Sequence, residues 1–313
     1  MQDISPASPE ERAKHSRWDR SLAQLRPGAR IYEVAKRTAI GVWADGFIHA
    51  GNLAYLALLT LFPFFIIIAA IAHVFGLGTD TMAAINSVTR TLPYSVRTLL
   101  RQPVADVLAQ RTGSLLWLGA IVGLWTTGSF IETIRDILRR AYGIGYSAPF
   151  WRYRLSSAAM IVGAVMLMLT AFSIQLVLTG VEQFVIHLFP LAHDVIGWIG
   201  WSRAAPAVAL FVSLYLIFYA LTPAKYRWAG CPKWPGALFT TLWWVATTMA
   251  LPRVLALLGG YDRTYGSLAG VIVALLFFWV VGLGLVIGAQ LNAALAETPS
   301  AGLKDTQQAP EEE

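Results

Sequence analysis

The chain has 313 residues, of which 56% are hydrophobic and only 13% are charged, and it contains 12 Trp. This length allows one large or two small soluble domains, but the high apolar fraction is typical of a membrane protein. The formal net charge of +6 comes from basic residues spread between apolar stretches, which does not favour a nucleic-acid-binding patch. The single cysteine, Cys231, excludes a disulfide within the chain.

The first part of the chain, residues 1–28, is polar and charged, with no apolar segment that follows a short basic start. We predict a disordered cytoplasmic tail without a cleavable signal peptide. Between residues 29 and 47 the side chains Ile31, Val34, Ala35, Thr38 and Val42 recur at helical spacing. This pattern predicts an amphipathic helix that either lies along lipid headgroups or docks on the cytoplasmic ends of the membrane spans.

Six apolar stretches are long enough to cross a bilayer as helices, and the clearest, residues 267–289, contains no charge and no Pro. We therefore predict an all-α, polytopic membrane protein in which residues 29–297 form one membrane domain and residues 298–313 a disordered acidic tail. The predicted spans are residues 50–75, 113–131, 155–179, 205–221, 235–257 and 266–290. Residues 77–112 and 181–204 are too polar to span, so we predict interfacial helices on the outer face.

The basic residues predict how the chain is oriented. With six spans, 17 of the 24 Lys and Arg residues fall on the side that carries both termini. Because cytoplasmic loops are enriched in Lys and Arg, this distribution predicts that both termini lie in the cytoplasm. A seventh span through residues 181–201 would move the cations of the 225–233 loop outside and weaken this bias.

A few polar residues lie within the spans or at their ends, and these are the candidate site residues. Asn52 and Tyr55 share a helix face and either hydrogen-bond to a neighbouring helix or line a polar path. Glu132 and Arg135 are placed for a local ion pair, with a gating or substrate role as the alternative. Further candidates are Pro63, which should bend its span, Gln175 in the third span, and the amides Gln290 and Asn292 that end the last one.

Two glycine pairs, Gly119 with Gly123 and Gly284 with Gly288, have the four-residue spacing that lets a neighbouring helix backbone approach closely. His187, His193 and Asp194 match no standard metal-site spacing, and no nucleophile elbow, zinc motif or phosphate-binding loop is present. We therefore predict no metal, no cofactor and no enzymatic activity.

The chain resembles the YihY/virulence factor BrkB family of bacterial inner-membrane proteins, which have been mislabelled as ribonuclease BN. The resemblance covers residues 35–296 and is most specific in three places: Pro235-Gly236-Ala237, Tyr261 with Tyr265-Gly266-Ser267, and Gly288-Ala289-Gln290-Leu291-Asn292. The stretch from Ala54-Tyr55 to Phe62-Pro63 is a moderate match. Relatives commonly carry Glu where this chain has Gln290, which argues against a proton or cation role at that position.

The resemblance implies a six-helix inner-membrane protein with cytoplasmic termini, connected with envelope integrity and serum resistance. Two functions stay open. One is a transporter-like or lipid-handling protein, for which broken helices and amides within apolar spans are required. The other is a non-transporting envelope component that holds partners, either envelope proteins or a second copy of the chain. A ribonuclease is the least favoured alternative, because the carboxylates are dispersed among basic residues.

Overall fold

The computed structural model describes residues 8–9, 29–74, 114–145, 149–166, 205–227, 231–258 and 266–296. Its elements are α3 (Ala29–Gly41), the π-helix η1 (Val42–Gly46), α4 (Phe47–Val74), α7 (Ser114–Tyr142), α10 (Ala205–Leu221), α11 (Ala224–Arg227), α12 (Trp234–Leu258), the 3-10 helix η4 (Gly266–Leu268) and α14 (Ala269–Leu295). Residues 150–166 are also helical. The described part contains helices and no strand, which confirms the predicted all-α class.

The long helices coincide closely with the apolar stretches. Predicted span 205–221 is α10, and predicted span 235–257 is α12 with one more residue at each end. Within the described residues, α14 is the one helix that is both long and apolar enough to cross a membrane, and residues 207–221 form a shorter apolar helix. The count of six spans therefore stays a prediction. Predicted span residues 167–179 and the predicted interfacial segments lie outside the described residues.

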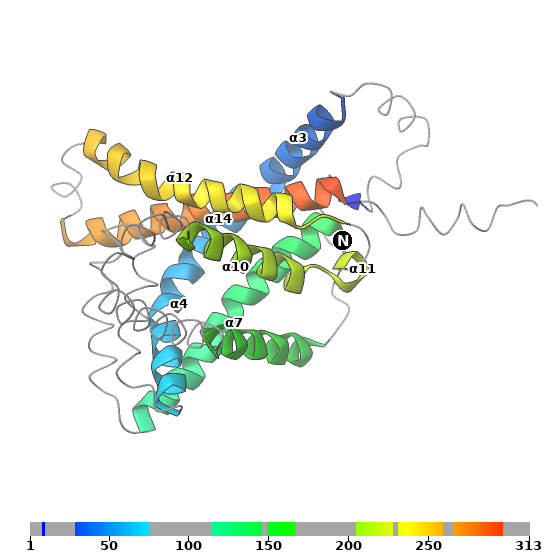
Figure 1. Ribbon diagram of the computed structural model, residues 1–313. Coiled ribbons are helices and arrows are strands. Elements are labelled where there is room, and N and C mark those ends of the chain that lie inside the picture. The colour runs from blue at the N-terminus through cyan, green and yellow to red at the C-terminus, as the bar shows by residue number, and fades with distance from the viewer. Residues whose placement is uncertain are drawn as a thin grey trace, which may run out of the picture.

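The helix α14 lies at the centre of the described structure. It packs side by side with α12 and also contacts α3, α4 and α7, while α4 and α7 pack on each other (Figure 1). Its residues are apolar on all sides, as expected for a helix with neighbours around it. Phe277 is fully buried in one apolar cluster with Ile67 and Val165, and Val286 is buried in a second cluster with Ile137 and Phe218.

One end of the helix assembly gathers segments from far apart in the sequence. Figure 1 places the end of α7, all of α11, the start of α12 and the end of α14 on the same side. The tyrosine rings of Tyr142 in α7 and Tyr226 in α11 lie 5.0 Å apart between centroids, and both residues are fully buried. The predicted cytoplasmic ends of the spans in α7, α12 and α14 thus lie on one side of the assembly.

The helix α3 buries only part of the stripe that the sequence pattern predicts. Thr38 is buried and Val34 and Val42 are partly buried, whereas Ile31 and Ala35 are exposed. As a whole, α3 packs on α14. Both predicted placements of this helix, along lipid headgroups and docked on the ends of the spans, therefore stay open. The π-helix η1 then continues α3 directly into α4, where Phe47 stacks on Trp279 of α14.

Candidate functional site

The start of α12 is tied to α14 by one amide side chain. The first N–H groups of a helix have no partner within the helix, and Pro235 has no N–H. The N–H of Gly236 instead donates to Oδ1 of Asn292 at 2.8 Å, and Nδ2 of Asn292 donates to the carbonyl of Lys233 at 3.1 Å. Asn292 is only 1% exposed. Both ends of this amide therefore serve backbone groups, and the residue fixes how α12 begins.

Glycines let the two helix backbones meet at the same place. A Cβ on Gly236 would collide with the Gly288 carbonyl oxygen, and a Cβ on Gly288 would collide with the Thr240 hydroxyl. The Thr240 hydroxyl bonds to the Gly236 carbonyl at 2.8 Å and lies 3.2 Å from the Gly284 carbonyl. The predicted close approach at Gly284 and Gly288 is thus confirmed. We call Gly236, Thr240, Gly284, Gly288 and Asn292 the α12–α14 joint.

Lys233 extends this joint to α11. Its buried ammonium donates to the carbonyls of Tyr226 and Arg227, at 2.9 and 2.8 Å, where α11 ends. The last carbonyls of a helix lack partners within the helix, and a cation is favourable beside them. Burial lowers the pKa of the Lys233 ammonium; the neighbouring Cys231 partly opposes this effect, and the charge of Arg227 adds to it. Hydrogen bonds between side chains and backbone groups thus connect α11, Lys233, the start of α12 and Asn292.

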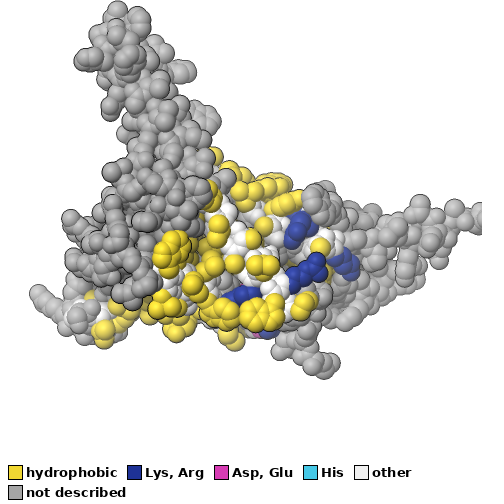
Figure 2. Space-filling view, turned by 90° about the horizontal axis from the view of Figure 1, so that it is seen from below, with side chains coloured by type: hydrophobic (Ala, Val, Ile, Leu, Met, Phe, Trp, Pro, Cys, Tyr) yellow, Lys and Arg dark blue, Asp and Glu magenta, His cyan; other side chains and the backbone are white. Residues whose placement is uncertain are grey.

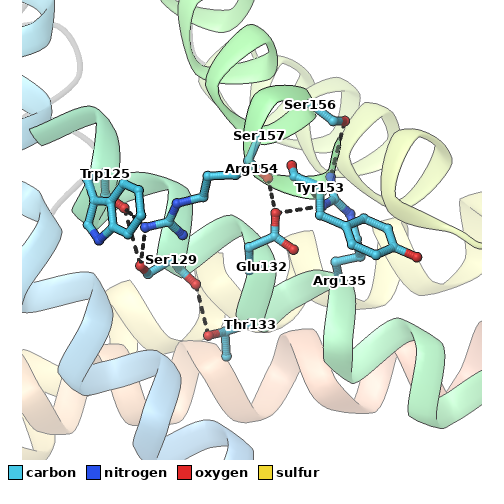
Figure 3. Close-up of polar contacts among 9 residues, drawn as sticks. All are labelled: Trp125, Ser129, Glu132, Thr133, Arg135, Tyr153, Arg154, Ser156 and Ser157. Carbon is cyan, nitrogen blue, oxygen red and sulfur yellow. Dashed lines mark hydrogen bonds and ion pairs between the residues drawn. The ribbon is translucent and has the colours of Figure 1, made fainter. Parts of the chain in front are cut away.

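A second polar cluster joins α7 to the 150–166 helix (Figure 3). Oε1 of Glu132 accepts hydrogen bonds from Nη1 of Arg135 at 2.6 Å and from Oγ of Ser157 at 2.5 Å. Nη2 of Arg135 donates to Oγ of Ser156 at 3.3 Å. The predicted local ion pairs Glu132–Arg135 and Asp136–Arg140 are both present. The first of them also reaches across to a second helix, which its spacing alone does not show.

Aromatic rings hold the other guanidinium groups of this cluster. The Tyr153 ring lies 5.2 Å from the Arg135 guanidinium carbon and 4.7 Å from that of Arg139. The guanidinium of Arg154 lies 4.0 Å from the Trp125 ring, and its Nη2 donates to the Trp125 carbonyl at 2.6 Å and to Ser129 at 3.0 Å. We call this set the α7 junction; it comprises Trp125, Ser129, Glu132, Arg135, Arg139, Tyr153, Arg154, Ser156 and Ser157.

The remaining candidate residues do not share one environment. Asn52 and Tyr55 both lie on an exposed face of α4, and Tyr55 is 60% exposed, whereas Gln290 in α14 is only 4% exposed. Among the described residues, no side-chain hydrogen bond is made by Asn52 or Tyr55. Hydrogen bonding to another helix and a polar path therefore both stay open for these two residues.

The structure describes the local surroundings of two further candidates. Pro63 lies within α4, and its carbonyl oxygen is 2.8 Å from the position that a Cβ on Gly123 would occupy, so α4 and α7 meet closely there. Gly266 opens η4 with a φ of +51°, a left-handed conformation that favours glycine. Ser267 follows it in η4, while Gln175, Tyr261 and Tyr265 lie outside the described residues.

Sequence reasoning missed several residues of both clusters. Lys233 and Arg154 entered the prediction only as charges that set orientation, and Thr240 and Trp125 were not singled out. A signal was available for Arg154, because an arginine at the start of an apolar helix needs a partner for its guanidinium. For Thr240, the sequence carries no comparable signal, since threonine is common in helices of either environment.

Comparison with known proteins identifies the family. The family described as "Virulence factor BrkB" matches residues 43–313. The chain belongs to this family. It is also 28% identical over 261 residues to the ribonuclease-like protein YfkH of Bacillus subtilis (strain 168), across 80% of this chain and 90% of that protein. No solved structure matches the chain. Membership of the BrkB family, which is membrane-associated, confirms the resemblance and assigns the chain to the membrane proteins.

Proposed function

We propose that this BrkB-family chain is a multi-pass protein of the bacterial inner membrane, with both termini in the cytoplasm, and that it acts as a transporter-like or lipid-handling protein of the envelope. The observation that carries the proposal is the one-sided placement of basic residues. The cations of the α7 end, the 150–166 helix, α11 and the start of α12 lie toward one end of the assembly, whereas Arg253 lies near the opposite end of α12.

The lateral surface supports a lipid environment. Large apolar side chains are exposed on several helices, among them Trp43, Ile121, Leu242 and Met249. Figure 2 shows many hydrophobic side chains on the described part of one face, with Lys and Arg toward the side where Figure 1 places α11. Contiguous exposed apolar surface of this kind is characteristic of membrane contact, and cations at one edge fit the side that faces the cytoplasm.

The α7 junction supports the handling of a polar or charged group. Glu132 and Arg135 are largely withdrawn from solvent, with side chains 22% and 9% exposed, and they lie at the end of a predicted span. Ionisable side chains in such positions are costly, and in membrane proteins they mark substrate or ion pathways. We therefore place the candidate site at this junction rather than at Asn52 and Tyr55.

Reconstitution tests this proposal directly. Proteoliposomes that contain the purified chain are assayed for ion flux and for lipid scrambling, with Glu132→Gln as the site variant and Glu33→Gln as its matched control. We expect activity in the wild type and the control and a large loss in Glu132→Gln. Reporter fusions in the 225–233 loop should report a cytoplasmic location, and a periplasmic location would overturn the proposed topology.

The second candidate, a non-transporting envelope component that holds protein partners, is favoured by the α12–α14 joint. Two of the three most specific family motifs meet there, and their polar groups bond to each other's backbone instead of lining a path. Absence of flux in proteoliposomes, together with envelope proteins or further copies of the chain that co-purify, would support this candidate.

We propose no nuclease activity, although YfkH carries a ribonuclease-like name. Among the four carboxylates within the described residues, those of Glu33, Glu132 and Asp136 are engaged in ion pairs with arginine. Metal-dependent nucleases instead hold metal ions with clustered carboxylates. No group of three or more His, Cys, Asp or Glu in the described part is placed to bind a metal ion. Purified protein that cleaved RNA in a metal-dependent manner would overturn this proposal.

A further inference from the structure

Arg154 differs from Arg135 and Arg140 of the same region in what balances its charge. The carboxylates of Glu132 and Asp136 pair with Arg135 and Arg140. No carboxylate in the described part of the chain pairs with Arg154, whose Nη2 bonds only to the Trp125 carbonyl and the Ser129 hydroxyl. Its Nε is buried and has no partner among the described residues. A guanidinium is thus held between two helices with unused hydrogen-bonding capacity and with no carboxylate partner in the described part of the chain.

Exposed aromatic rings surround this guanidinium. Trp125, Phe150 and Trp151 are 51%, 57% and 71% exposed. The ring centroids of Phe150 and Trp151 lie 6.3 and 6.5 Å from that of Trp125, and the Arg154 guanidinium lies 5.9 Å from the Phe150 ring. Exposed Trp and Phe beside a cation are typical of the headgroup level of a membrane, where one part of the residue meets lipid and the other meets water.

An apolar stripe leads away from the rings along α7. Leu118, Ile121 and Val122 are exposed and lie on the same side as Trp125, because they precede it by seven, four and three residues. At 1.5 Å per residue, the stripe extends about 10 Å from Trp125 into predicted span 113–131. This arrangement complements a phospholipid: the cation and the rings suit the phosphate headgroup, and the apolar stripe suits an acyl chain.

We propose that Arg154, with Trp125, Phe150 and Trp151, binds the phosphate headgroup of an anionic phospholipid, whose acyl chain lies along Leu118, Ile121 and Val122. The inference rests on the membrane placement proposed above. Arg152, which is exposed two residues before Arg154, adds positive charge on the same side. The apolar stripe is the feature that favours a lipid over a soluble phosphate compound, since a free phosphate has no use for it.

The test measures lipid preference with the full chain in nanodiscs and by native mass spectrometry. Retention of phosphatidylglycerol is compared with that of phosphatidylcholine for the wild type, Arg154→Gln and the control Arg253→Gln. The control removes an exposed arginine near the C-terminal end of α12, away from the proposed lipid site. One cation near an anionic lipid surface contributes about a fivefold change in binding. We expect a preference for phosphatidylglycerol in the wild type and in Arg253→Gln, and a roughly fivefold lower preference in Arg154→Gln.

A second variant keeps the inference testable if Arg154→Gln does not fold. Phe150→Ala/Trp151→Ala changes only exposed rings, and it should lower the preference for phosphatidylglycerol without loss of folded protein. Equal losses in Arg253→Gln and Arg154→Gln would overturn the inference, as would full competition by soluble glycerol phosphate. A chain that enters nanodiscs but shows no lipid preference refutes this site alone, whereas a chain that does not enter them refutes the membrane placement.

Discussion

The α12–α14 joint and the α7 junction both bring polar side chains between helices, but they use them differently. In the joint, Asn292 and Thr240 bond to backbone groups of the neighbouring helix start and helix interior. In the junction, Glu132 and Arg135 bond mainly to each other and to serine side chains. Backbone partners are fixed by the fold, while side-chain partners can rearrange when a ligand arrives.

The exposure of the two regions differs in the same sense. Asn292, Thr240 and the joint glycines are buried, whereas the junction opens onto the exposed Trp125 ring. Within apolar surroundings a polar group needs a partner, and in the joint the bonds are made within the protein. In the junction, Arg154 retains hydrogen-bonding capacity among the described residues. This difference separates a structural lock from a candidate binding site.

The largest effect should come from the joint. In Gly288→Leu the new side chain meets the Thr240 hydroxyl and the Gly236 backbone, so α12 and α14 have to separate. We expect a loss of roughly 3 kcal/mol in the free energy of unfolding in detergent, at the upper end of overpacking effects. The control Gly163→Ala, at a helical position where a Cβ meets nothing within 4 Å, should be neutral or slightly stabilising. Equal losses in the two variants would show that the joint is not tightly packed.

Removal of the amide should have the next largest effect. Asn292→Leu leaves the buried Gly236 N–H without a partner and removes one of the two hydrogen bonds to the Lys233 carbonyl, which keeps that from the Ala237 N–H; we expect a cost of about 2 kcal/mol in the free energy of unfolding. The exposed amide of Asn52 offers a control of the same residue type. Asn52→Ala should change the stability by less than about 0.5 kcal/mol. A larger loss for Asn52→Ala would indicate that Asn52 is covered in the folded protein, and would weaken the contrast between buried and exposed amides.

Much of the helical architecture can be predicted because long apolar stretches have few alternatives. The uncharged run before Gln290 predicts α14, although the helix begins at Ala269 after η4 and continues to Leu295. Spacing also predicts close packing at Gly284 and Gly288 of the joint. It does not predict the partner, because Gly236 and Asn292 are 56 residues apart and meet only through the packing of two helices.

The parts that could not be predicted depend on which side of a helix faces the protein. A local pair such as Glu132–Arg135 follows from helical spacing, but its contact with Ser157 requires the position of a second helix. The role of Arg154 likewise depends on Trp125 being opposite it. Helical spacing groups Ile31 with Thr38 on α3, yet Thr38 is buried and Ile31 is exposed, so spacing alone does not show which members of the stripe pack on the protein.

The ion pair of the junction should contribute less to stability than the joint does. Glu132→Gln keeps an oxygen that can accept from Ser157 but removes the charge opposite Arg135, so we expect a loss of about 1 kcal/mol in the free energy of unfolding. Glu33→Gln removes the carboxylate of the more exposed Glu33–Arg37 pair and should lower the stability by about 0.3 kcal/mol. A loss in Glu132→Gln as large as that in Asn292→Leu would mean that the junction is also a structural lock.

The smallest effect concerns Tyr142, which lies where α7 meets α11 and follows the junction along the chain. Burial raises the pKa of its hydroxyl, and the neighbouring Cys231 thiol raises it further. In the unfolded chain the hydroxyl ionises near pH 10, so its contribution to stability is complete below pH 10 and is lost as the pH rises above it. The free energy of unfolding of the wild type minus that of Tyr142→Phe should be about 0.8 kcal/mol smaller at pH 10.5 than at pH 8. The measurement is the free energy of unfolding of both proteins at the two pH values. An unchanged difference would show that water reaches the Tyr142 hydroxyl. The end of α7 would then be as solvated as the α7 junction and not as buried as the α12–α14 joint.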